Sequence, residues 1–291
     1  MTRPADAVLV ALLLCAPLLA SKLVRAEQVA VGYSEGLVHG FLALRTLEGD
    51  TIAEGDLSQA ARGDRVTTRL TFHFKDGSLH EETAIYSQRR VFQLLKYHLI
   101  EKGPTFQHPM ETSIEVAAGQ VTVRTTEDDG REKMISQHMN LPLDLANGLT
   151  LTLLKNIRPR STPTKLSMVA ATPKPRLVKL AITAQGEEPF STAGTARKAM
   201  HYVVKIEIGG AAGLIAPLLG KEPPDIHVWI LLGDAPAFVK SEGPLYYGGP
   251  IWRIELASPV WPKPPGGNSK YEHPKDEHPQ DEHPGDDHIQ N

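Results

Sequence analysis

The residues RLTFHF (69–74), followed by KDGS (75–78), carry the strongest local signal for the fold. Leu70, Phe72 and Phe74 alternate with polar residues, which is the pattern of a strand with one buried face. Asp76-Gly77 follows directly, and Asp-Gly between two such runs is a strong signal for a tight turn between antiparallel strands. This stretch therefore predicts a β-hairpin.

Similar runs recur along the chain, separated by turn residues. Residues 113–117 and 120–124 alternate on either side of Ala118-Gly119, residues 127–130 form a further turn, and residues 177–182, 205–208 and 226–232 are strand-like. Pro175 cannot donate to a sheet ladder, so the run at 177–182 should begin after it. Repeated short strands with regular turns predict a mainly β fold. We expect an antiparallel open barrel or half-barrel; a closed barrel and a sandwich remain alternatives.

About one helix is expected in the same domain. Leu145, Leu149 and Leu153 recur at the spacing that places them on one helical face. Asp144 precedes them, and a carboxylate at this position can accept hydrogen bonds from the free N–H groups of the first turn. We therefore predict a helix within residues 142–155, with Asp144 as its N-cap.

The N-terminus predicts export. A positive Arg3 precedes the apolar run 7–20, which is too short to span a bilayer, and Ala26 ends a suitable cleavage site. We expect a signal peptide over residues 1–26, cleaved after Ala26, and a periplasmic or cell-envelope location. An uncleaved anchor and a lipoprotein modified at Cys15 are the alternatives. Cys15 is the only cysteine, so the mature chain would form no disulfide.

The remainder divides into a β-rich domain, residues 27–262, and a polar tail, residues 263–291. The tail carries a net charge of −4 and the domain −1. Because nucleic-acid binding needs a basic face, a near-neutral domain argues against that partner.

Motifs for catalysis are missing from the sequence. It has no Gly-x-Ser-x-Gly, no His-Glu-x-x-His, no Gly-Lys-Ser/Thr phosphate loop and no cysteine in the domain. The missing motifs argue against enzymatic activity but do not exclude it. If the protein is an enzyme, His227 and Asp225 are the candidate residues of a hydrolase.

The apolar segment between Gly213 and Gly220 is the best candidate for ligand contact. Leu214, Ile215, Leu218 and Leu219 would form a lip if this segment is exposed, because exposed apolar patches usually mark interaction sites; packing in the core is the alternative. In residues 225–232, Ile226, Val228, Ile230 and Leu232 share one face, and Trp229 lies on the other. Trp229 is thus a further ligand candidate.

Residues 208–262 resemble exported bacterial proteins of unknown function. Within them HVWILLGDAPAFVKSEG, residues 227–243, with Asp234 and Pro236 at its turn, is similar to periplasmic proteins of the lipoprotein-carrier type. That resemblance implies an open antiparallel half-barrel with a helical plug that holds acyl chains. The ligand-binding arginine of the carriers has no counterpart in this chain.

The tail repeats a five-residue unit built around His273, His278, His283 and His288. Proline in the repeat prevents helix formation, and the polar, acidic composition predicts disorder. Imidazoles and carboxylates also ligate first-row metals, so weak binding of Zn²⁺, Ni²⁺ or Cu²⁺ is one hypothesis. A solubilising end without a metal role is the other.

Three functions follow from these patterns. The first is an exported non-catalytic protein of the envelope that binds a lipid or other hydrophobic ligand, with a membrane surface as a further partner. The second is a metal-associated envelope protein acting through the tail, without a structural cofactor in the domain. The third is the hydrolase named above. The sequence indicates neither the ligand nor the oligomeric state.

Overall fold

The computed structural model describes residues 27–257, apart from 128–129, 161, 193–194 and 210–221. A 14-stranded antiparallel sheet dominates this part of the chain, in the order β8-β7-β6-β5-β4-β3-β2-β1-β14-β13-β12-β11-β10-β9. The mainly β, open architecture expected from the sequence is confirmed, because β8 and β9 are edges that do not pair with each other. The strands are β1 Val38–Arg45, β2 Thr51–Arg62, β3 Arg65–Phe74, β4 Leu79–Gln88, β5 Phe92–Lys102, β6 Met110–Glu115, β7 Gln120–Thr126, β8 Glu132–His138, β9 Thr164–Ala170, β10 Arg176–Thr192, β11 Thr195–Glu207, β12 Ile226–Leu231, β13 Ala237–Pro244 and β14 Ile251–Leu256.

The hairpins predicted from local alternation are present. β3 and β4 pair on either side of the Asp76-Gly77 turn, where Gly77 has a φ of 85° and Ser78 N donates to Asp76 Oδ1 at 2.9 Å. β6 and β7 also pair, although residues 116–118 between them form a single 3₁₀ turn, η1 (Val116–Ala118), rather than strand. β10 begins at Arg176, directly after Pro175, as predicted.

One helix, α1 (Thr150–Asn156), follows the first eight strands. Leu145, Leu149 and Leu153 are all buried in the same cluster, but only Leu153 lies within the helix, so the predicted helical face is correct only in part. The predicted N-cap is wrong: the helix begins later, with Leu149 at the capping position. The segment before it is held elsewhere, because Leu145 bridges to Ser167 of β9 and Ser167 N donates to Asp144 O.

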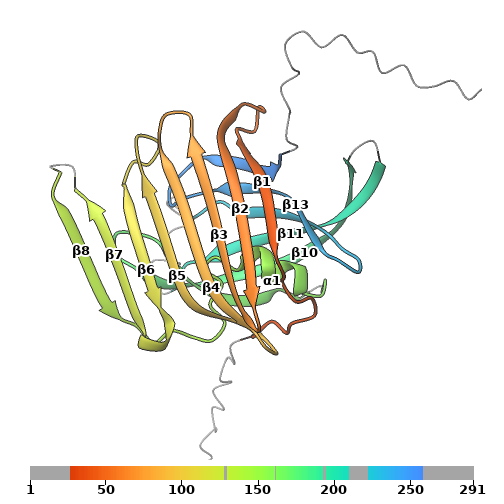
Figure 1. Cartoon of the computed structure of the whole chain (residues 1–291), viewed down its shortest axis with the longest axis horizontal. Coiled ribbons are helices and arrows are strands. Elements are labelled where there is room, and N and C mark those ends of the chain that lie inside the picture. Colours follow the sequence, from red (N-terminus) through yellow and green to blue (C-terminus); the bar gives the residue numbers. More distant parts are fainter. Residues whose placement is uncertain (1–26, 128–129, 161, 193–194, 210–221, 258–291) are drawn as a thin grey trace, which may run out of the picture. The chain divides into compact units, whose positions relative to one another are not determined.

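The core forms where the two halves of the sheet enclose the helical segment. Figure 1 shows α1 between the front strands and β10–β13. Leu149 and Leu154 are fully buried and belong to a cluster that includes Tyr86 of β4 and Tyr202 of β11. Tyr202 OH donates to the carbonyl of Ile157 at 3.0 Å, which fixes the end of the helix against the rear strands. A smaller cluster around Phe72, Phe74 and Phe106 fills the other end of the same face.

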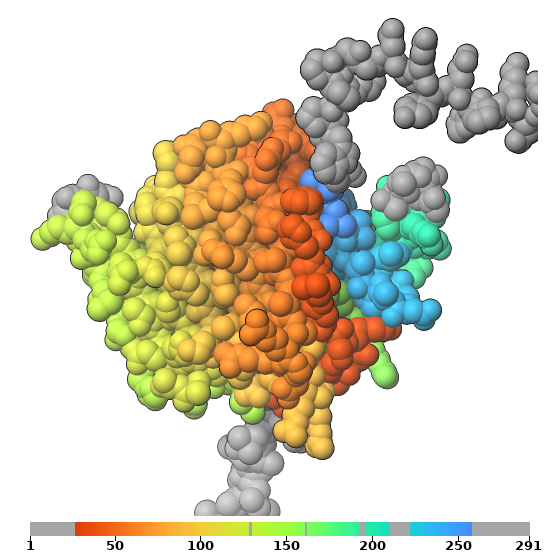
Figure 2. Space-filling model, in the orientation of Figure 1, coloured from red at the N-terminus to blue at the C-terminus, as the bar shows by residue number. Residues whose placement is uncertain are grey.

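The two edge strands of the sheet, β8 and β9, differ in whether other backbone segments bond to them. Residues 144–147 lie along β9 and bond to it: Ala146 N donates to Ser167 O at 2.8 Å, and the Asn147 side chain makes reciprocal 2.9 Å bonds with Val169 N and O. β8 pairs with β7 on one side and, within the described residues, with no strand on the other. The outer surface of β1–β8 is continuous up to this margin (Figure 2).

Several expectations fall outside the described part of the chain. They concern the signal peptide, its cleavage after Ala26 and the tail, residues 263–291, all of which stay predictions. Among the described residues, no helix has both the length and the apolar character needed to cross a bilayer.

Candidate ligand-binding site

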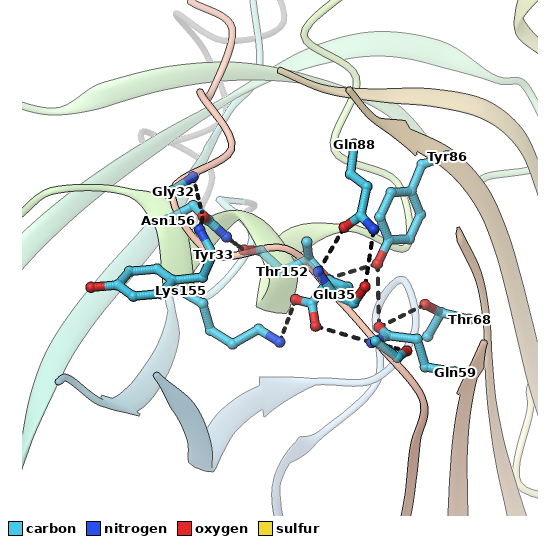
Figure 3. A network of polar contacts seen from close by, with 11 residues as sticks. Gly32, Tyr33, Glu35, Gln59, Thr68, Tyr86, Gln88, Thr152, Lys155 and Asn156 are labelled. Carbon is cyan, nitrogen blue, oxygen red and sulfur yellow. Dashed lines mark hydrogen bonds and ion pairs between the residues drawn. The ribbon is translucent and has the colours of Figure 1, made fainter. Parts of the chain in front are cut away.

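Glu35 is the centre of a buried polar network on the concave side of the sheet (Figure 3). Its carboxylate forms an ion pair with Lys155 of α1 through Oε1, and accepts a 3.0 Å hydrogen bond from Gln59 Nε2 through Oε2. The side chains of Glu35 and Lys155 are 7% and 20% exposed, respectively. Since an isolated buried carboxylate is very costly, this pairing explains how Glu35 is accommodated.

Neighbouring hydroxyl groups fix the orientation of the Gln59 amide. Gln59 Oε1 accepts from Tyr86 OH at 3.2 Å and from Thr68 Oγ1 at 3.1 Å, so its Nε2 is directed toward Glu35. The Thr152 hydroxyl of α1 lies 3.3 Å from Tyr86 OH. Burial raises the pKa of Tyr86, which keeps its hydroxyl protonated and able to donate.

Residues 32–35, the segment before β1, are held by hydrogen bonds between their backbone groups and the side chains of Gln88 and Asn156. Gln88 Oε1 accepts from Glu35 N at 2.6 Å, and Gln88 Nε2 donates to Glu35 O at 2.9 Å. Asn156, the last residue of α1, accepts from Gly32 N at 2.9 Å and Tyr33 N at 2.7 Å. These four bonds hold the segment across the end of α1, and so place Glu35 beside Lys155.

A pocket of about 370 Å³ opens beside this network. Its walls are Gly32, Tyr33, Ser34, Glu35, Lys155 and the β12–β13 turn, Asp234–Pro236. A pocket of this size can hold a small polar molecule or the head of a larger one. Among the described residues of the wall, Lys155 is the only cation, while Asp234 is exposed at its side.

An apolar stripe adjoins the polar network on the same face. We define it as Leu57, Leu70, Phe238 and Ile254, which pack against the smaller core cluster but are only partly buried. Leu57 and Leu70 are directly opposite each other on β2 and β3, and the next inward pair is Gln59 and Thr68. The polar pair and the partly buried apolar pair are therefore two residues apart along β2 and β3.

The ligand residues predicted from the sequence are only partly testable. Leu214, Ile215, Leu218 and Leu219 lie outside the described residues. Trp229 is on β12, on the face opposite to Val228 and Ile230, whose side chains are in the core. Its Nε1 donates to Glu188 Oε2 at 2.7 Å, its ring stacks on His201 at 4.4 Å, and Lys240 Nζ lies 4.0 Å from its centroid.

Among the described residues, His227 and Asp225 are not joined by a hydrogen bond or ion pair. His227 Nδ1 lies 2.9 Å from His201 Nε2. The tail histidines 273, 278, 283 and 288 are outside the described residues. In the part that is described, no group of three or more His, Cys, Asp or Glu side chains is arranged to hold a metal ion.

Sequence reasoning missed Glu35, Gln59 and Lys155. Gly32 and Asn156 are 124 positions apart in the chain, and no local motif links such residues. The one available signal was Gln59, a polar residue at an inward position of an alternating strand.

No family model and no curated protein sequence matches this chain. Among solved structures, it is similar to the crystal structure of a β-barrel-like protein of a domain of unknown function, DUF1849, from Brucella abortus. The identity is 8%, the match covers 77% of this chain and 98% of that chain, and the TM-score is 0.43. The resemblance to lipoprotein carriers stays a prediction.

Proposed function

We propose that this protein is an exported, non-catalytic binding protein for a single-chain amphiphile. The observation that supports this most directly is that an apolar surface and a polar network lie next to each other on the concave face. The stripe of partly buried apolar residues comprises Leu57, Leu70, Phe238 and Ile254. On β2, Leu57 lies two residues from Gln59, which bonds to Glu35 in the polar network. An acyl chain would cover the stripe, because burying apolar surface is favourable, and a polar head would occupy the pocket.

The pocket also suggests the chemistry of the head. Both carboxylate oxygens of Glu35 are already used, by Lys155 and Gln59. The Lys155 ammonium has three N–H donors, of which Glu35 engages one among the described residues. An acceptor oxygen on the ligand would bond to Lys155, and Asp234 at the other wall favours a donor or cation. A zwitterionic head satisfies both groups.

Binding of a fluorescent single-chain zwitterionic lysophospholipid tests the head contact. The double variant Glu35→Gln/Lys155→Met removes both charges together, because Lys155→Met alone would leave a buried carboxylate unpaired at a cost of about 3–5 kcal/mol. We expect the Kd for the lysophospholipid to rise about tenfold, the loss of one charge-assisted hydrogen bond. The Kd for an alkyl alcohol of equal chain length should not change. Lys165→Met, at an exposed lysine of β9, is the matched control.

The apolar contact is tested separately. Leu57→Ser with Leu70→Ser should abolish binding of both the lysophospholipid and the alcohol, whereas Leu143→Ser, at a half-exposed leucine outside the stripe, should not. Native mass spectrometry of protein recovered after export without detergent gives a second measurement, an added mass that is lost on denaturation. Full binding by a folded Leu57→Ser/Leu70→Ser protein would overturn the proposal.

A further inference from the structure

The free edge of β8 offers a surface that the proposed ligand site does not use. β9, the opposite edge, is covered by residues 144–147 through hydrogen bonds to Ser167 and Val169. β8 has no such backbone cover within the described residues; beyond β7, its inward-facing Gln137 donates to the Pro175 carbonyl at 3.1 Å. Glu132, Met134, Ser136 and His138 are exposed along the strand. Met134 is 63% exposed. An uncovered strand edge presents unpaired N–H and C=O groups to a further strand.

The hydrogen bonds to β7 identify which backbone groups of β8 point outward. Glu127 N donates to Arg131 O at 2.9 Å and Met139 N donates to Gly119 O at 2.7 Å, at the two ends of the ladder. Hydrogen-bonded pairs recur at every second residue of an antiparallel ladder. Residues 133, 135 and 137 therefore bond to β7, and residues 132, 134, 136 and 138 direct their N–H and C=O groups to the open side.

We propose that β8 pairs with β8 of a second copy, antiparallel and with the two-fold axis at Ile135. In this register Glu132 faces His138 of the partner subunit and Met134 faces the partner's Ser136. Both are hydrogen-bonded pairs, so every outward N–H and C=O of the two strands is used. Ile135 meets its own copy on the inner side of the sheet, where its β7 partner is the buried Val123.

Side-chain chemistry favours this register. Glu132 is opposite an imidazole at both ends of the pair, and an imidazole N–H can donate a hydrogen bond to a carboxylate oxygen. Lys133 is opposite Gln137 of the partner subunit, so no like charges are directly opposed. Shifting the register by two residues would leave Glu132 or His138 without a hydrogen-bonded opposite residue. A second copy thus fits the edge in both hydrogen bonding and charge.

Cysteine cross-linking tests the register directly in the full chain with Cys15 replaced by alanine, where an introduced thiol is the only one. In the proposed dimer, the two Cα atoms at position 135 are about 4.5 Å apart, within the range that a disulfide requires. Those at position 133 are roughly 14 Å apart, from the rise per residue. We expect Ile135→Cys to form covalent dimers and Lys133→Cys, whose native side chain is 56% exposed, to remain monomeric. Equal cross-linking of both variants, or of neither, would overturn the proposal.

Sedimentation over a concentration series tests the contact without a covalent bond. Met134→Pro removes an outward N–H that β7 does not use, so the protein should fold, with an unchanged melting temperature, and become monomeric. Met134→Thr keeps that N–H and should still dimerise. Glu132→Lys should weaken the dimer by at least threefold in Kd, and adding His138→Glu should restore it. A native chain that is monomeric at all concentrations, or a dimer that survives Met134→Pro, would contradict the pairing.

Discussion

At the scale of single residues, the clearest result is the environment of Trp229. Its indole N–H and the His201 ring both bind Glu188, at 2.7 Å and 2.8 Å. The hydrogen bond from Trp229 lowers the pKa of Glu188, with a smaller contribution from His201 and with burial acting in the opposite direction. The tryptophan thus acts as a donor on the outer face.

We predict that Trp229→Phe raises the pKa of the Glu188 carboxyl toward its ordinary value, because the indole donor is lost. A carboxyl whose pKa is lowered by folding stabilises the protein above its unfolded pKa, and this contribution is lost as pH falls through the folded pKa. Carboxyl ¹³C chemical shifts followed through an acid titration measure the change. Trp252→Phe, on the concave side near Phe74, should leave the Glu188 curve unaltered. An unaltered curve in Trp229→Phe would contradict the assignment.

At the scale of elements, the segment before α1 shows that packing, rather than helix propensity, determines where the helix begins. α1 has only seven residues, and such short helices are not stable by themselves. Gly148 has a φ of 68°, and a Cβ there would lie 2.7 Å from Ala84 Cβ and 3.2 Å from the Tyr97 ring. Close approach to β4 and β5 therefore requires glycine just before the helix.

Gly148→Ala is predicted to lower the free energy of unfolding by about 3 kcal/mol, from left-handed backbone strain and overpacking together. Gly63 is the matched control, since its φ is 62° but a Cβ added there would have no atom within 4 Å. Gly63→Ala should cost about 1 kcal/mol, the strain alone. Urea unfolding measures both values. Equal costs for the two variants would show that the contact with Ala84 and Tyr97 is relieved without penalty.

At the scale of the whole molecule, β1 and β14, the first and last of the described strands, join the two halves of the sheet. β1 pairs with β14, with Leu44 opposite Ile254, and Arg45 Nε donates to Glu255 Oε1 at 2.6 Å across this junction. Such long-range pairing cannot form until most of the chain is available, so folding should be slow compared with a helical protein of equal length.

The whole chain also allows a prediction about metals. Because the tail repeats histidines beside carboxylates, at His273, His278, His283 and His288, we expect any uptake of Zn²⁺, Ni²⁺ or Cu²⁺ to reside there. Deleting residues 271–291 should abolish uptake measured by titration calorimetry, while the melting temperature stays unchanged. Uptake that persists in the shortened chain would place the metal elsewhere and remove support for the tail hypothesis.

Elements whose signals are local could be predicted from the amino-acid sequence. Alternation placed the Arg69–Ser78 hairpin, Pro175 set the start of β10, and Val228 and Ile230 were correctly assigned to one face, because a strand's side-chain period is a property of adjacent residues. Tertiary structure decided the rest. The start of α1 depends on the bond from Ser167 to Asp144, and the Glu35–Lys155 pair on curvature that brings residues 120 positions apart into contact. These contacts stabilise the protein only once the sheet has folded around the helix, so no short stretch of sequence predicts them.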